Sequence, residues 1–129
     1  KTAYEIVSRD WSSDVCSSDL VFDSMRADAV SERIALVRQR LGARAPQVTL
    51  HVNCYWVGVG EHWKAAADGV GGFIGYDGAA LDATPYALYG EVSQVVEKIH
   101  RLHEQWGFTY FSIPSGNLRE FAPVIAALQ

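Results

Sequence analysis

The sequence has few cysteines, few basic residues and no long apolar run, which excludes several classes of protein. It has only two cysteines, Cys16 and Cys54, too few for a disulfide framework or a zinc site with four cysteine ligands. Its 11 Lys and Arg are outnumbered by 15 Asp and Glu, whereas nucleic-acid binding needs clustered positive charge. No apolar run approaches the roughly 18 residues of a membrane-spanning helix. We therefore expect no nucleic-acid partner, no metal site and no membrane span, and a cytoplasmic location.

The composition is instead typical of a single folded domain. Hydrophobic residues make up 49% of the 129 positions and charged residues 20%, which is the balance of a globular protein rather than a disordered one. This length is enough for one hydrophobic core.

The first twenty residues show neither helical nor strand periodicity. Residues 10–20, DWSSDVCSSDL, resemble the translation of a common sequencing-library adaptor, and residues 1–6, KTAYEI, resemble the translation of a second adaptor segment. We predict that residues 1–20 are a non-native, adaptor-derived segment, to be set aside in fold reasoning. The alternative is a natural polar tail. The domain would then occupy residues 21–129, as a fragment of a longer protein.

Apolar spacing in residues 21–129 predicts helices that alternate with strands. Helices are expected at 24–41, 91–106 and 118–128, because apolar residues recur there every three or four positions. Strands are expected at 48–57 and 108–113, lying side by side and parallel. The alternation predicts an α/β fold with a parallel sheet.

The segment between the first strand and the second helix is rich in glycine. Residues 58–78 hold seven of the eleven glycines, and we expect a long loop there, of the kind that forms lids over functional sites. Residues 82–90 are expected to be an irregular approach to the next helix. The glycines match neither the dinucleotide-binding fingerprint nor a phosphate-binding loop.

The strand at 48–57 has one apolar and one polar face. Side chains alternate across a strand, so Cys54 lies on the apolar face and is expected to be a small buried hydrophobe. His51, Asn53 and Tyr55 share the other face and are the candidate cofactor- or substrate-binding residues. The alternative is that this row is structural, with its polar groups hydrogen-bonded to one another.

The C-terminal third of the chain resembles a known family. The motifs LYGEV at 88–92, WGFTYF at 106–111 and FAPV at 121–124 resemble the C-terminal end of the luciferase-like monooxygenase superfamily. The group of deazaflavin-dependent oxidoreductases is the most similar, and AVSERI at 29–34 also fits it. No catalytic motif of the family lies in the resembling segment, so no catalytic residue is assigned.

The resemblance implies a fold and a chemistry. The chain would be the C-terminal fragment of a (β/α)8 TIM barrel, contributing two parallel strands and their flanking helices. The parent would be an oxidoreductase that acts on a small-molecule substrate with reduced coenzyme F-420 or FMN, and the fragment alone would be inactive. A homo-oligomer of the parent is left open. The alternative is a small non-catalytic α/β module for binding or regulation.

Overall fold

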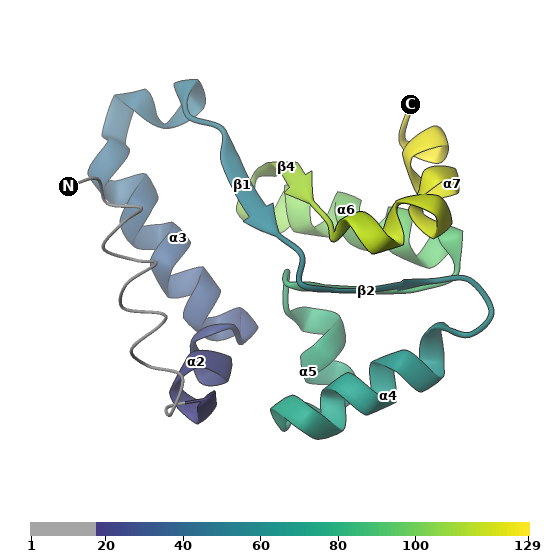
Figure 1. Ribbon diagram of the computed structural model, residues 1–129. Coiled ribbons are helices and arrows are strands. Elements are labelled where there is room, and N and C mark those ends of the chain that lie inside the picture. The colour runs from purple at the N-terminus through teal and green to yellow at the C-terminus, as the bar shows by residue number, and fades with distance from the viewer. Residues whose placement is uncertain (1–17) are drawn as a thin grey trace.

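The computed structural model describes residues 18–129. Helices and short parallel strands alternate along the chain (Figure 1), which confirms the predicted α/β class. The helices are α2 (Ser18–Ser24), α3 (Ala27–Leu41), α4 (Trp63–Ile74), α5 (Gly78–Ala83), α6 (Val92–Trp106) and α7 (Leu118–Leu128). The strands are β1 (Leu50–Asn53), β2 (Trp56–Val59), β3 (Ala87–Gly90) and β4 (Phe108–Ser112), and short 3-10 turns span Gly42–Gln47 and Ser115–Asn117.

The prediction of a non-native segment falls mostly on residues 1–17. These residues lie outside the described part of the chain.

The strands form two separate parallel pairs. β1 pairs with β4, which confirms the predicted parallel pairing of these two segments, and β2 pairs with β3. The expected single strand at 48–57 is therefore interrupted at residues 54 and 55, and its second part turns to another partner. In a closed barrel each strand pairs with its neighbours in chain order. Here β4 pairs with β1 and not with β3.

The expectation of only two strands was wrong, because β3 lies in a segment expected to be irregular. Three of its four residues, Ala87, Leu88 and Gly90, are buried. A strand this short and buried on both faces shows no alternation of polar and apolar residues, which is the signal that identifies strands in a sequence.

The expectation of a long glycine-rich loop was also wrong, since α4 and α5 occupy most of that segment (Figure 1). The buried residues of α4 are Ala67, Gly71 and Ile74, which follow the i, i+4, i+7 spacing of an amphipathic helix. At Gly71 a Cβ atom would lie 2.8 Å from the carbonyl oxygen of Tyr76, so glycine lets the helix pack closely. Gly75, with φ of 77°, ends the helix in the left-handed conformation.

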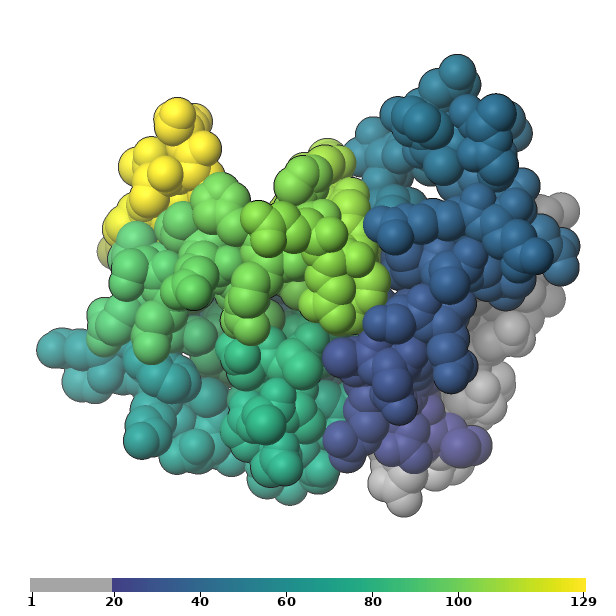
Figure 2. Space-filling view, turned by 180° about the vertical axis from the view of Figure 1, so that it is seen from behind, coloured from purple at the N-terminus to yellow at the C-terminus, as the bar shows by residue number. Residues whose placement is uncertain are grey.

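The main core lies between the strands and α3, α6 and α7. Val30 and Ile34 of α3 are buried, whereas Val37, three residues after Ile34, is 39% exposed. Seen from behind, the chain near the C-terminal end of α6 meets α3 (Figure 2). There the indole N–H of Trp106 donates a hydrogen bond to Ser31 Oγ at 2.9 Å. The buried members of the main core from the strands, α6 and α7 are Val52, Cys54, Val57, Leu88, Val95, Ile99, Leu102, Trp106, Phe108, Phe121 and Val124.

A second apolar cluster joins α4 and α5 to β3. It contains Ala67, Ile74, Tyr76, Leu81 and Ala87, with Phe22 and Trp56 packed against it. The side chains of two neighbouring β3 residues therefore pack in different clusters: Leu88 in the main core and Ala87 in this second cluster. β3 is therefore covered on both faces.

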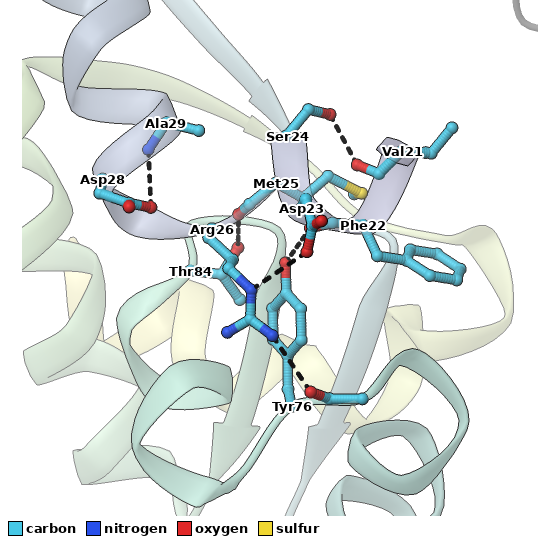
Figure 3. A network of polar contacts seen from close by, with 11 residues as sticks. Val21, Phe22, Asp23, Ser24, Met25, Arg26, Asp28, Ala29, Tyr76 and Thr84 are labelled. Carbon is cyan, nitrogen blue, oxygen red and sulfur yellow. Dashed lines mark hydrogen bonds and ion pairs between the residues drawn. The ribbon is translucent and has the colours of Figure 1, made fainter. Parts of the chain in front are cut away.

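A network of polar contacts joins α2 and its junction with α3 to the loop between α4 and α5 and to Thr84, just after α5 (Figure 3). The guanidinium carbon of Arg26 lies 4.3 Å from the centre of the Tyr76 ring, which is a cation–π contact. Arg26 also donates to the Gly75 carbonyl at 3.1 Å, and the Tyr76 hydroxyl donates to the Phe22 carbonyl. The buried Thr84 hydroxyl donates to the Met25 carbonyl at 2.6 Å.

We expect Thr84→Val to lower the free energy of unfolding by about 1–2 kcal/mol. Valine keeps the shape of threonine but leaves the buried Met25 carbonyl without its donor. The measurement is urea denaturation followed by circular dichroism. The control is Ser24→Ala, which removes an exposed hydroxyl that donates to Val21 and should cost less than about 0.5 kcal/mol. Equal losses in the two variants would mean that the Thr84 contact is not special.

Candidate functional site

Two of the three predicted site residues meet on the β1–β4 sheet. His51 Nε2 lies 2.9 Å from Ser112 Oγ, and the Ser112 hydroxyl donates to Asn53 Oδ1 at 3.0 Å. Because the only hydroxyl proton of Ser112 goes to Asn53, the His51 nitrogen is the donor in its contact with Ser112. The result is a chain of hydrogen bonds from His51 through Ser112 to Asn53.

The parallel register explains why these side chains meet. His51 is paired with Tyr110 and Asn53 with Ser112, so that paired side chains point to the same side. The rings of His51 and Tyr110 are 4.8 Å apart in an edge-to-face arrangement. We call His51, Asn53, Tyr110 and Ser112 the polar face. Sequence reasoning missed Tyr110 and Ser112, although their spacing of two residues on a predicted strand could have indicated them.

Tyr55 is not part of this hydrogen-bond chain. Its backbone N–H donates to the carbonyl of Tyr86, just before β3. Its ring lies 6.0 Å from that of Tyr86 and 6.1 Å from that of Trp56, and the residue is 48% exposed. The interruption between β1 and β2 therefore separates Tyr55 from His51 and Asn53.

The opposite side of β1 is apolar and covered. Val52 and Cys54 are buried in the main core together with residues of α3, α6 and α7. The Cys54 thiol contacts the Pro85 carbonyl at 3.5 Å, and burial raises the pKa of Cys54 to about 12. Because a nucleophilic cysteine reacts as the thiolate, Cys54 has a packing role, as the sequence predicts.

A separate cavity of about 670 Å³ opens between α4, α5, β3 and α6. We call it the Lys98 cavity, because the side chain of Lys98 forms part of its wall and is only 3% exposed. Lys98 Nζ donates to the carbonyl of Leu81 at 3.3 Å and to that of Ala87 at 2.5 Å. The wall of the cavity also contains Trp63, Lys64, Tyr76, Gly78, Asp82, Tyr89, Glu97 and Arg101.

Sequence reasoning missed Lys98, although a signal was present. Lys98 is three residues after Val95 and four before Leu102, so it shares the buried face of α6 with both. A lysine inside an apolar stripe is rarely buried without a specific partner. Here the partners are two backbone carbonyl oxygens, which only the tertiary fold brings together.

The surroundings of Lys98 change its acidity. Burial lowers the pKa of Lys98 from 10.5 to about 8, since the charged form loses its hydration. The negative charge of Asp82 opposes this decrease, and the positive charge of Arg101 adds to it. Asp82 and Arg101 are themselves paired, with Arg101 Nη2 3.2 Å from Asp82 Oδ1 at the surface.

The described residues offer few other sites. Within residues 18–129, no group of three or more His, Cys, Asp or Glu side chains is placed to hold a metal ion. In the same part of the chain, no helix combines the length and the apolar composition needed to cross a membrane.

Comparison with other proteins adds no constraint on function. No protein-family model, curated protein or solved structure matches the chain.

Proposed function

We propose that the chain is the C-terminal part of a TIM-barrel oxidoreductase of the luciferase-like type, which reduces or oxygenates a small molecule with coenzyme F-420 or FMN. The observation that supports this is the two-sided character of the β1–β4 sheet. Its apolar side packs on helices, and its other side carries the polar face. In a barrel the helices surround the strands, so the polar face would line the interior.

The positions of the polar residues along their strands also favour a site. Asn53 is the last residue of β1 and Ser112 is the last residue of β4. Barrel enzymes build their active sites at the carboxyl ends of the strands. Asn53 and Ser112 would therefore lie at the mouth, and His51 and Tyr110 one step deeper.

The polar face fits part of a flavin-type cofactor. The bound cofactor would carry the hydride or activate oxygen. His51, Asn53 and Ser112 offer hydrogen bonds to ring carbonyls or ribityl hydroxyls, and Tyr110 offers an aromatic surface. None of the four residues is Lys or Arg, so the phosphate groups of either cofactor would be held by other residues.

The test is a fluorescence titration of the full-length parent, with its upstream strands, against FMN and against coenzyme F-420. We expect one of the two to bind. Asn53→Leu should weaken binding by about 1–3 kcal/mol, because the cofactor or substrate group that Asn53 contacts loses its partner. Tyr55→Phe, which removes the third predicted group, should weaken binding if the Tyr55 hydroxyl reaches the ligand.

The control is Thr49→Val, which alters an exposed residue just before β1, at the opposite end of the strand from Asn53. It should bind like the native protein. Failure of both cofactors to bind would contradict the proposed function. Unchanged affinity in Asn53→Leu and Tyr55→Phe would contradict only the site.

One observation favours a second candidate, the small non-catalytic α/β module. β4 pairs with β1 although β3 precedes it in the chain, which is not the order of a closed barrel. The upstream reading frame distinguishes the two candidates. Upstream βα units of about 200 residues support the barrel, whereas a start codon near Val21 supports the module.

A further inference from the structure

The amine of Lys98 has a hydrogen-bonding arrangement that suits its neutral form. A neutral amine has two N–H groups and one lone pair, whereas an ammonium group has three N–H groups. Within the described residues Lys98 Nζ meets two acceptors, the carbonyls of Leu81 and Ala87. Two donors therefore match two acceptors, and the lone pair of the nitrogen is left for another partner.

The environment of Lys98 supports the same form. Burial and the charge of Arg101 lower the pKa of Lys98, as described above. At pH 7.5 a lysine with a pKa of about 8 is roughly one-quarter neutral, whereas an ordinary lysine is about 0.1% neutral. Desolvation and a neighbouring cation are the two ways in which proteins make a lysine nucleophilic.

The wall of the Lys98 cavity indicates what could approach this amine. Trp63, Tyr76 and Tyr89 contribute aromatic surface, and Leu81 adds an aliphatic side chain. Charges of both signs also line the cavity, so neither an anion nor a cation is favoured strongly. A volume of about 670 Å³ falls within the range of small-molecule sites. The cavity therefore suits a small, uncharged, aromatic molecule.

We propose that the Lys98 cavity binds a small uncharged aromatic aldehyde and that Lys98 captures it as an imine. This site is distinct from the polar face and goes beyond the proposed flavin chemistry. The carboxylates that line the same cavity are those of Asp68, Asp77, Asp82 and Glu97. Because Asp82 is paired with Arg101 and Asp77 accepts from the Ala80 N–H, Asp68 and Glu97 are the groups available for proton transfer.

The reaction balances without a further reagent. The lone pair of Lys98 Nζ attacks the carbonyl carbon, an N–C bond forms, and the C=O π electrons move to oxygen. A proton passes from nitrogen to that oxygen, which gives a carbinolamine. A proton from the solvent then adds to the hydroxyl, which leaves as water while the nitrogen lone pair forms the C=N bond. The product is the protonated imine, which keeps one N–H. Hydride from added cyanoborohydride converts the imine to a stable secondary amine for detection.

The experiment treats the 129-residue chain with benzaldehyde and sodium cyanoborohydride at pH 7.5, followed by peptide mapping with mass spectrometry. The chain has three lysines, Lys1, Lys64 and Lys98, so each adduct can be assigned. Lys64 is an internal control, because it lines the same cavity but is exposed. We expect Lys98 to be labelled at least about tenfold faster than Lys64, because burial increases the neutral fraction of Lys98 and the bound aldehyde is held beside its amine. The rate should saturate with benzaldehyde concentration.

Two variants test whether the cavity is responsible. Gly78→Trp adds bulk to the cavity wall at a position with open space around it, and Gly116→Trp adds the same bulk at an open position outside the cavity. Labelling of Lys98 should fall at least fivefold in the first variant and stay unchanged in the second. Lys98→Arg should abolish the fast-labelled peptide while circular dichroism reports the native fold.

Three results would overturn the proposal. Labelling of Lys64 as fast as Lys98 would show that Lys98 has no special reactivity. A linear dependence on benzaldehyde concentration would show that no binding precedes the reaction. Equal labelling of Lys98 in the two glycine variants would show that the cavity does not hold the aldehyde.

Discussion

Leu88→Ala is expected to lower the free energy of unfolding by about 3 kcal/mol. Leu88 is completely buried at the centre of β3 and belongs to the main core. Truncation removes apolar contacts and leaves a cavity, and such changes in well-packed cores cost about 2–5 kcal/mol. We expect a value in the middle of this range because apolar clusters pack on both faces of β3, which limits how far the structure can shift to fill the cavity. Urea denaturation followed by circular dichroism measures the change.

The matched control is Leu118→Ala at the start of α7. Leu118 is 54% exposed, so the same truncation should change the free energy of unfolding by less than about 0.5 kcal/mol. The denaturant dependence should stay the same in both variants, because neither alters the surface exposed on unfolding. If Leu88→Ala cost no more than Leu118→Ala, β3 would not be part of the core.

Leu88 also illustrates what could be predicted of the fold from the sequence. The buried apolar residues of α6 follow a helical period, from which the helix was predicted, and the parallel pairing of the segments that contain β1 and β4 was predicted as well. β3 was not predicted because a strand of only four residues, three of them buried, shows no alternation of polar and apolar residues. α4 was not predicted because its glycines, which disfavour helices, concealed the helical spacing of Ala67, Gly71 and Ile74. In the structure, Gly71 is needed where the helix packs closely against the backbone of Tyr76.

The candidate sites, too, could be predicted from the sequence only in part. A period of two placed His51 and Asn53 on one face, and the structure joins them through Ser112. The contribution of Ser112 depends on the register between β1 and β4, which a single strand pattern does not determine. The burial of Lys98 depends on α4, α5 and β3 closing over α6, which again requires the tertiary fold.

The stability of the native chain relative to Lys98→Met is expected to rise by about 2 kcal/mol between pH 6.5 and pH 9.5. Lys98 has a pKa of about 8 in the folded chain and 10.5 ordinarily. Below pH 8 the lysine is charged in both states, so the cost of burying its charge is fully present. Between pH 8 and pH 10.5 the folded state loses the proton and the unfolded state keeps it, so this cost is progressively removed. Methionine has a similar length and no titrating group.

The difference between the two proteins isolates Lys98 from other groups that titrate nearby. Burial raises the pKa of Cys54 to about 12, so Cys54 makes both proteins less stable as pH rises above 9, and its effect largely cancels in the difference. The ionisable groups that act on Lys98 are Asp82 and Cys54, which favour its charged form, and Arg101, which opposes it. Asp68, Asp77, Lys64 and Glu97 also line the cavity and are retained in both proteins.

The control for this prediction is Lys64→Met, which removes an exposed lysine from the same cavity. The difference between its stability and that of the native chain should stay constant from pH 6.5 to pH 9.5, because this substitution at the surface leaves the buried amine of Lys98 in place. Urea denaturation at intervals of half a pH unit measures the three curves. A constant difference between the native chain and Lys98→Met would mean that Lys98 stays charged in the fold through pH 9.5. The neutral amine that imine formation requires would then be absent at neutral pH.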